Sequence, residues 1–185
     1  GDGEKVVGML TLPAPDEGPG TPEQPASQTS MDFLKSAKKS KKSEGNDSEF
    51  LVVSANGFGF RFPLSNLGET TRSGRKIMSL KNDDSMIGFA PVTHNHVFLA
   101  TEKGKAVVIA TEQIAQLTGS GKGVILMKPG ESRLTGFKLV SLKDKVTLVF
   151  DSGKDKQITV KSVRLCNRGS QGVIVSKRKT ILKIK

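Results

Sequence analysis

Basic side chains recur in three short segments that are otherwise rich in glycine and serine. The segments are Arg72-Ser73-Gly74-Arg75-Lys76, Gly119-Ser120-Gly121-Lys122-Gly123 and Arg168-Gly169-Ser170-Gln171-Gly172. Small residues let backbone N–H groups approach a phosphate closely, and arginine and lysine supply the opposite charge. These segments, the basic turns, therefore favour phosphate binding through five candidate side chains: Arg72, Arg75, Lys76, Lys122 and Arg168.

A second set of cations lies in or beside three segments with a hairpin pattern. Its members are Arg61, Lys103, Lys105, Lys154 and Lys156. Contacts of this kind hold a nucleic-acid backbone in place without reading its bases, so we expect weak sequence specificity. Together the two sets predict a DNA-binding surface.

The distribution of charge supports a polyanionic partner. The 185 residues include 29 Lys and Arg against 18 Asp and Glu, a net charge of +11. Residues 50–185 alone hold 23 basic and 9 acidic side chains, a net charge of +14. A folded unit with this charge attracts polyanions.

Several patterns that could indicate catalysis lack the partners that the chemistry needs. The Gly119–Gly123 turn resembles a phosphate loop, but Gln116 stands where that motif has a glycine and Gly123 where it has Ser or Thr. The pairs Ser36/Lys39 and Ser176/Lys179 match Ser-x-x-Lys without any supporting motif. The chain contains no Tyr, so a tyrosine nucleophile is excluded. We predict no catalytic residue in this chain.

Metal and disulfide chemistry are not expected either. His94 and His96 could face the same side of an extended segment, but a zinc site needs further ligands. The single Cys166 is far away in sequence and reads as a small buried hydrophobic residue. Asp83 and Asp84 are adjacent and would point apart in an extended segment. The lone cysteine gives no reason to expect an oxidising compartment.

The chain divides by composition. Residues 13–49 contain five of the eight prolines and a Lys/Ser-rich run, and we expect a disordered insertion there. Residues 1–12 have the form of the tail of a preceding repeat. The start lacks a signal peptide and an initiator Met, so we expect a piece of a longer protein. No run of roughly 18 apolar residues predicts a membrane span.

The remaining residues read as strands and turns. Short apolar runs rich in β-branched and aromatic residues meet at hairpin turns that contain Gly57, Gly104 and Gly153. A short apolar-bounded segment follows each hairpin, and then comes a basic turn that runs into a further predicted strand at 77–80, 124–127 or 173–176. No long window has a helical period. The predicted fold class is all-β.

The three hairpins are copies of one unit, because their turn glycines lie 47 and 49 residues apart. Units of this length with about four strands indicate a propeller-like array whose sheets stack on one another. The predicted blades cover about 50–92, 97–140 and 146–185. Three units are few for a closed ring, so we expect the complete array to be longer. Equivalent basic turns would then recur around the rim and form a curved band on which a duplex could bend.

The repeats and residues 1–12, but not 13–49, resemble a known family, and the first repeat shows this most fully. Phe50-Leu51-Val52-Val53, Asn56-Gly57-Phe58-Gly59-Phe60-Arg61, Pro63-Leu64-Ser65 and Gly74-Arg75-Lys76 look like one blade of the C-terminal domain of bacterial type IIA topoisomerase A subunits. That family includes the A subunits of DNA gyrase and of DNA topoisomerase IV. The resemblance implies a β-pinwheel, in which four-stranded blades exchange a strand with a neighbour and DNA runs around the outer rim.

The resemblance also bears on the two branches of the family. Gyrase is marked by a Q-R-R-G-G-K-G box in its first blade, and none of the three basic turns is that box. The opening residues 1–13 and the basic segment 176–185 are similar to topoisomerase IV. We therefore favour topoisomerase IV and keep gyrase as the alternative.

The resemblance further implies partners, cofactors and a location. The partners would be double-stranded DNA, the rest of the A subunit, and the B subunit in a heterotetramer, with no membrane. ATP, Mg²⁺ and the strand-cutting tyrosine would belong to other parts of the enzyme, in the cytoplasm at the nucleoid. Two other readings stay open: a protein-interaction platform that docks a partner on 13–49, and an RNA-binding β protein. The absence of Tyr and Trp for base stacking disfavours the RNA reading.

Overall fold

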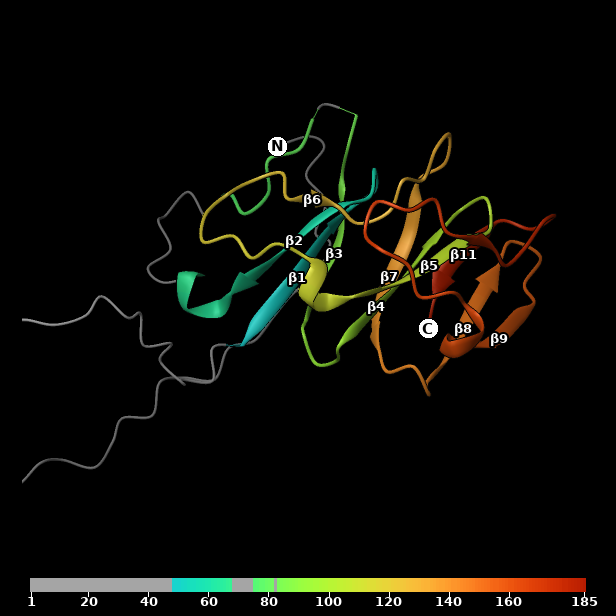
Figure 1. Cartoon of the computed structure of the whole chain (residues 1–185). Helices are drawn as coiled ribbons and strands as arrows, with labels where there is room; N and C mark the ends of the chain where they lie inside the picture. Colours follow the sequence, from blue (N-terminus) through green and yellow to red (C-terminus); the bar gives the residue numbers. More distant parts are fainter. Residues whose placement is uncertain (1–47, 68–74, 82) are drawn as a thin grey trace, which may run out of the picture. The chain divides into compact units, whose positions relative to one another are not determined.

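The computed structural model describes residues 48–67, 75–81 and 83–185, which form three antiparallel sheets (Figure 1). The expected tail at 1–12, almost all of the expected insertion at 13–49, and Arg72 lie outside the described residues. Among the described residues there is no helix long and apolar enough to cross a membrane. The all-β prediction is confirmed, because the only helical segments described are three short 3-10 turns: η1 (Leu64–Leu67), η2 (Thr111–Gln113) and η3 (Val160–Ser162).

The first sheet shows how the repeats are joined. It contains β1 (Glu49–Ser54), β2 (Phe58–Pro63) and β3 (Met86–Pro91) from one repeat. Its fourth strand, β6 (Val124–Ile125), comes from the next repeat and pairs with β2 through Phe58 and Gly59. The order is β3-β1-β2-β6. In Figure 1 the yellow β6 lies beside the cyan β2 although about 60 residues separate them.

The second sheet repeats this arrangement and the third sheet does not. β4 (His96–Thr101), β5 (Lys105–Ala110) and β7 (Leu134–Val140) are completed by β10 (Val173–Ile174) in the order β10-β5-β4-β7. The third sheet has β8 (Lys145–Phe150), β9 (Asp155–Thr159) and β11 (Ile181–Ile184) in the order β11-β8-β9. Within the described residues, no strand pairs with the outer edge of β9.

The prediction of a strand at 77–80 was wrong. Only Met78 makes a bridge there, to Gly121 of the next repeat. The equivalent segments at β6 and β10 become strands because the preceding repeat offers them an edge, on β2 and β5. Among the described residues no sheet precedes β1, so residues 77–80 have no such edge. A short strand is stable only when it pairs.

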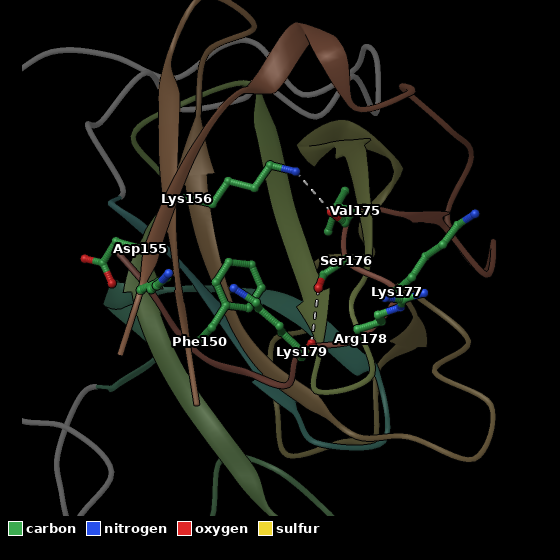
Figure 2. A pocket seen from close by; sticks show the side chains of 9 residues that line it. Phe150, Asp155, Lys156, Val175, Ser176, Lys177, Arg178 and Lys179 are labelled. Carbon is green, nitrogen blue, oxygen red and sulfur yellow. Dashed lines mark hydrogen bonds between the residues drawn. The ribbon is translucent and has the colours of Figure 1, made fainter. Parts of the chain in front are cut away.

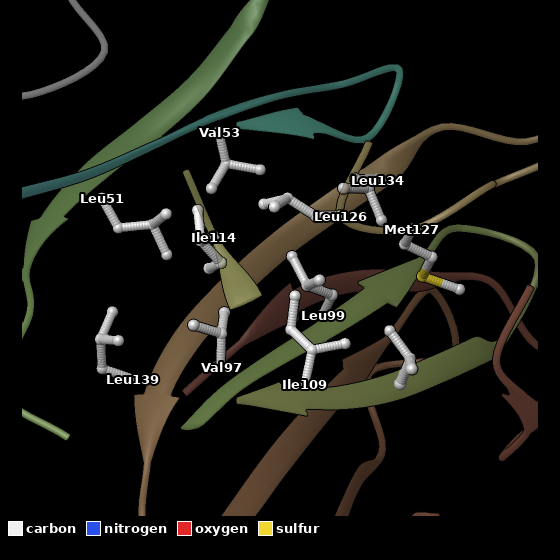
Figure 3. Close-up of a cluster of buried hydrophobic side chains, with 11 residues drawn as sticks. Leu51, Val53, Val97, Leu99, Ile109, Ile114, Leu126, Met127, Leu134 and Leu139 are labelled. Carbon is white, nitrogen blue, oxygen red and sulfur yellow. The ribbon is translucent and has the colours of Figure 1, made fainter. Parts of the chain in front are cut away.

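Apolar side chains from neighbouring sheets meet in shared clusters. One cluster joins Leu51 and Val53 of β1 to Val97 and Leu99 of β4, as Figure 3 shows. Leu126 belongs to the same cluster and is fully buried. A second cluster joins β4 and β5 to β8, β11 and η3. Because each sheet buries a face against the next, a repeat would not be stable alone.

Candidate nucleic-acid interface

Glycine carbonyls on two hairpins hold the segments that follow the basic turns. The Leu126 and Met127 N–H groups donate to the Gly57 carbonyl oxygen at 2.8 and 3.4 Å. One repeat later, the Val175 and Ser176 N–H groups donate to the Gly104 carbonyl oxygen at 2.8 and 3.1 Å. These two joints, the closed joints, anchor the last two basic turns to the sheet of the preceding repeat.

Close backbone packing explains why glycine occupies these hairpins. Gly57 and Gly104 have φ of 84° and 77°, and a Cβ on either would lie 2.1 Å from a carbonyl oxygen, of Met127 or Ser176 respectively. Such a distance is far inside van der Waals contact, and the left-handed conformation already disfavours other residues. The hairpin glycines found in the sequence are therefore requirements of the joint as well as of the turn.

Each of the last two basic turns lies against the segment that follows the basic turn of the preceding repeat. The Ser79 N–H donates to the Gly121 carbonyl oxygen, and the Lys128 N–H donates to the Ser170 carbonyl oxygen, both at 2.9 Å. Parallel bridges accompany these bonds, Met78 with Gly121 and Met127 with Ser170. Each turn thus sits against the chain that leaves the turn of the repeat before it. The predicted recurrence of basic turns has a regular structural basis.

The cationic side chains of the basic turns differ in their exposure and in their contacts with the rest of the protein. Lys76 and Arg168 are exposed, and Arg75 is exposed while donating to the Asn66 carbonyl oxygen. Lys122 is half-buried, and its Nζ lies 3.9 Å from the centroid of the Phe58 ring. This cation–π contact fixes the ammonium group at the first closed joint.

A side-chain cap fixes the third basic turn. The Arg168 N–H donates to Gln113 Oε1 at 2.9 Å. Gln113 Nε2 also lies 3.4 Å from Asn167 Oδ1. The turn is therefore tied to η2 of the preceding repeat while the Arg168 side chain stays exposed.

Arg61 makes contacts that were not foreseen. Its Nε donates to the Ile114 carbonyl oxygen at 2.9 Å, and its Nη1 forms an ion pair with Glu49 Oε2 at 2.8 Å. The side chains of Arg61 and Glu49 are only about a quarter exposed, at 23% and 25%. Arg61 therefore links β1 and β2 to the next repeat, and its role in phosphate binding stays a prediction.

The remaining hairpin cations fall into two groups. Lys103 and Lys105 belong to the second sheet, and Lys103 Nζ lies 3.6 Å from Glu131 Oε2 in an exposed pair of small energetic value. Lys154 and Lys156 belong to the third sheet and line a cavity of about 480 Å³. Lys156 Nζ donates to the Val175 carbonyl oxygen at 3.3 Å (Figure 2).

That cavity, the basic groove, gathers cations from two segments of the third repeat. Lys154, Asp155 and Lys156 line one side, and residues 175–179 line the other, with Phe150 between them. Figure 2 shows Lys179 near the Phe150 ring, and its Nζ lies 5.8 Å from the ring centroid. The groove contains five basic side chains and one acidic one: Lys154, Lys156, Lys177, Arg178 and Lys179, with Asp155.

The sequence prediction of contact residues missed Lys177, Arg178 and Lys179. A signal for them was present in the charge of each repeat. The predicted blades 50–92, 97–140 and 146–185 carry net charges of +2, +3 and +8. What only the structure shows is that residues 177–179 face the hairpin at Lys154 across one cavity.

The histidine pair lines a different cavity, of about 440 Å³, together with Ser141, Leu142 and Lys143. Thr93 Oγ1 lies 2.8 Å from His94 Nδ1. In the part of the chain that the structure describes, no group of three or more His, Cys, Asp or Glu could hold a metal ion. Cys166 is partly buried and packs against the cluster between the first two sheets.

Comparison with curated proteins finds topoisomerase A subunits. The A subunit of DNA gyrase from Lawsonia intracellularis is 28% identical over 130 residues, which are 68% of this chain and 16% of that protein. The A subunit of DNA topoisomerase 4 from Streptococcus pyogenes serotype M3 is 31% identical over 85 residues, which are 43% of this chain and 10% of that protein. The chain thus spans a small fraction of the length of these relatives.

Solved structures share the fold. The C-terminal domain of DNA topoisomerase IV matches with a TM-score of 0.68 and 21% identity, over 75% of this chain and 46% of that one. The DNA gyrase A C-terminal domain matches with a TM-score of 0.69 and 19% identity, over 75% and 50%. The predicted β-pinwheel architecture is confirmed.

The family assignment rests on one further match. A family model described as the DNA gyrase C-terminal domain, beta-propeller, matches residues 48–93, 95–150 and 151–180. These ranges cover most of the chain and every strand of the three sheets except β11. The chain belongs to the family of DNA gyrase C-terminal β-propeller domains, which the A subunits of gyrase and topoisomerase IV share.

Proposed function

We propose that this chain binds duplex DNA through its phosphate backbone, with little sequence preference, and bends it. The observation that carries the proposal is the position of the last two basic turns. Each lies against the segment that follows the preceding basic turn, through the bonds from Ser79 to Gly121 and from Lys128 to Ser170. Exposed cations on neighbouring turns can then contact successive phosphates of one duplex. Bending 20–30 bp by 40–90° costs on the order of 1–6 kcal/mol, which several phosphate contacts can offset.

The parent protein that we propose is a type IIA topoisomerase, and the chain would present a duplex segment for strand passage. Its partners would be the rest of the A subunit, together with the B subunit, in the bacterial cytoplasm at the nucleoid. The opening residues 1–13 and the basic segment 176–185 are similar to topoisomerase IV, so we favour topoisomerase IV, with DNA wrapping by gyrase as the alternative. ATP, Mg²⁺ and the cutting chemistry would lie outside this chain.

Salt dependence tests the binding proposal. Fluorescence anisotropy with labelled duplexes of about 30 bp and unrelated sequences should give similar affinities, with log affinity falling by about 0.9 per phosphate contact for each tenfold rise in salt. A flat salt response would refute phosphate binding. A strong preference for one sequence would contradict backbone recognition.

Variants test the basic turns themselves. Changing Arg72, Arg75, Lys76, Lys122 and Arg168 together to Gln should weaken binding to every duplex alike. Unchanged affinity would remove the basic turns as a contact site. The rate at which ligase closes duplexes of about 150 bp, near the persistence length of DNA, into circles measures bending. A rate that the chain leaves unchanged would mean binding without bending.

A further inference from the structure

The outer edge of β9 has a chemistry different from that of the edges in the closed joints. Two and three residues after each hairpin glycine stand Gly59-Phe60, Ala106-Val107 and Asp155-Lys156. Phe60 and Val107 are fully buried, whereas Asp155 and Lys156 are exposed. Small and apolar residues at the first two edges are thus replaced by charged residues at the third.

The close approach at the closed joints explains why this replacement matters. A Cβ on Gly123 would lie 2.4 Å from the Gly59 carbonyl oxygen, and a Cβ on Gly59 would lie 2.6 Å from Leu126 Cδ1. Around Gly153, by contrast, a Cβ would meet nothing within 4 Å. Lysine on an edge strand is a common way in which proteins prevent further strand pairing. The β9 edge is therefore poorly suited to accept another strand.

The same edge is well suited to bind an anion. Five cations line the basic groove, and its one acid, Asp155, already has Lys185 Nζ at 3.4 Å from its Oδ2. The opposite wall is held at both ends: the Val175 and Ser176 N–H groups bond to Gly104, and the Asp151 N–H donates to the Thr180 carbonyl oxygen at 3.1 Å. The cations at 177–179 thus stand on a segment with a fixed course.

This cluster occurs in one repeat only. Met127 and Ser176 stand at equivalent joints, as their bonds to Gly57 and Gly104 show, and the residues that follow Met127 are Lys128, Pro129 and Gly130. No run of three cations follows the closed joint of the second repeat. The run Lys177-Arg178-Lys179 is therefore a local feature and does not follow from the repeat pattern.

We infer that the basic groove at the open edge of β9 is the strongest phosphate-binding site of the chain and holds the backbone of duplex DNA. This inference rests on the proposed function and sharpens it, because it places most of the binding on the third sheet instead of spreading it evenly over the turns. A duplex would be anchored at the basic groove and would reach the basic turns from there.

Two charge-matched variants test the inference. The groove variant carries Lys154→Gln, Lys156→Gln, Lys177→Gln, Arg178→Gln and Lys179→Gln, all at exposed positions. The control carries Lys81→Gln, Lys128→Gln, Lys138→Gln, Lys143→Gln and Lys145→Gln, also exposed. Both lose five positive charges, so nonspecific attraction falls equally. Circular dichroism and thermal unfolding check that both retain the fold.

The inference predicts unequal losses. At about 100 mM salt the groove variant should bind a duplex at least about 30-fold more weakly than the unchanged chain, with a salt slope smaller by about 3 to 4.5. The DNA affinity of the control variant should fall less than about fivefold. Equal losses would overturn the groove as a site while leaving DNA binding intact. If the unchanged chain shows no salt-dependent binding, the proposed function fails together with the inference.

Amide chemical shifts give an independent readout that does not depend on variants. Titration with a short duplex should shift amides at 154–157 and 175–180 at lower DNA concentrations than amides at the basic turns. Shifts confined to the basic turns would overturn the inference. A peptide with the sequence of residues 121–128, which includes the residues Val124 and Ile125 that pair with β2 in the intact chain, serves as a competitor. If it pairs with β9 and leaves DNA binding unchanged, the edge is a strand acceptor that does not hold DNA and the inference is wrong.

Discussion

The second and third sheets have the same three-strand plan but end differently. β5 receives β10 on its outer edge, and the Gly104 carbonyl oxygen accepts two N–H groups from the segment that follows. β9 receives no described strand, and charged side chains occupy the edge. The comparison teaches that two or three residues after a hairpin decide whether an edge joins the next repeat or stays available to a ligand.

Net charge also differs between the repeats. The first two predicted blades carry net charges of +2 and +3, and the third carries +8. Cations placed inside a closed joint would have to give up hydration, which is costly. At an open edge they keep their hydration and can exchange it for phosphate contacts. Stability is therefore concentrated in the closed joints, and positive charge is concentrated at the open edge.

Adding one methyl group to a hairpin glycine should give the largest difference between the two kinds of edge. Gly57→Ala places a Cβ 2.1 Å from the Met127 carbonyl oxygen at φ 84°, and should cost about 3–5 kcal/mol of unfolding free energy from clash and left-handed strain combined. Gly153→Ala meets no atom within 4 Å and should cost only the strain, about 1–2 kcal/mol. Urea unfolding measures both. Equal costs would show that the Gly57 joint is not tight in solution.

Truncating the apolar residue that each joint supplies should give the next largest effect. Leu126 is fully buried at the first closed joint, and Leu126→Ala should cost about 3 kcal/mol through lost packing and a cavity. Val175, which stands at the equivalent place beside Gly104, is half-buried. Val175→Ala should cost about 1 kcal/mol. Thermal or urea unfolding of the two variants tests this difference in unfolding free energy. A larger loss of unfolding free energy for Val175→Ala than for Leu126→Ala would contradict the prediction.

Arg61 distinguishes stability from DNA binding. Arg61→Ala removes the bonds to Glu49 and Ile114 and should lower the unfolding free energy by about 1–2 kcal/mol. The salt slope of DNA binding should change by less than about 0.9, the value for one phosphate contact. Gln157 stands four residues after its hairpin glycine, as Arg61 does, and is exposed. Gln157→Ala should leave stability within about 0.5 kcal/mol of the unchanged chain. If Arg61→Ala keeps full stability but loses DNA affinity, Arg61 is a phosphate contact after all.

Lys122 should give the smallest effect. Lys122→Gln removes the cation–π contact with Phe58 and should lower the unfolding free energy by about 0.5–1 kcal/mol. It should also reduce the salt slope by about 0.9 if Lys122 contacts a phosphate. Gln171 stands at the equivalent place of the next basic turn, so Gln171→Lys is the matched gain. A rise in DNA affinity for Gln171→Lys without a change in unfolding would separate the two roles of this position.

The fold class and the hairpins could be predicted because their signals are local. Alternating β-branched and aromatic residues around Asn56-Gly57 specify a hairpin whatever its neighbours do. The repeat spacing then indicated stacked sheets, and the structure has them. The segment 77–80 was mispredicted because, like 124–127, it is a mostly apolar run that follows a basic turn. Pairing depends on an available edge, which no local pattern reveals.

The candidate site was predicted in part. The basic turns were visible as composition, and the structure shows that each of the last two is held against the segment that follows the preceding turn. Arg61 was grouped with the hairpin cations because its charge was visible and its partners were not: Ile114 lies 53 residues away in sequence. The basic groove was missed because Lys154 and Lys179 are separated by 25 residues and meet only when β9 faces the segment 175–179.

The sequence by itself determined the all-β class, the three-fold repetition, the hairpin glycines and the excess of positive charge. Each depends on residue type and on short spacings, which act through local backbone preferences and summed charge. Only the tertiary structure decided which edge each short strand joins, that Arg61 bonds within the protein, and that β9, with no described strand on its outer edge, lies beside five cations. These outcomes depend on distant segments meeting, because a strand edge or a cation is satisfied only by the group that folding places against it.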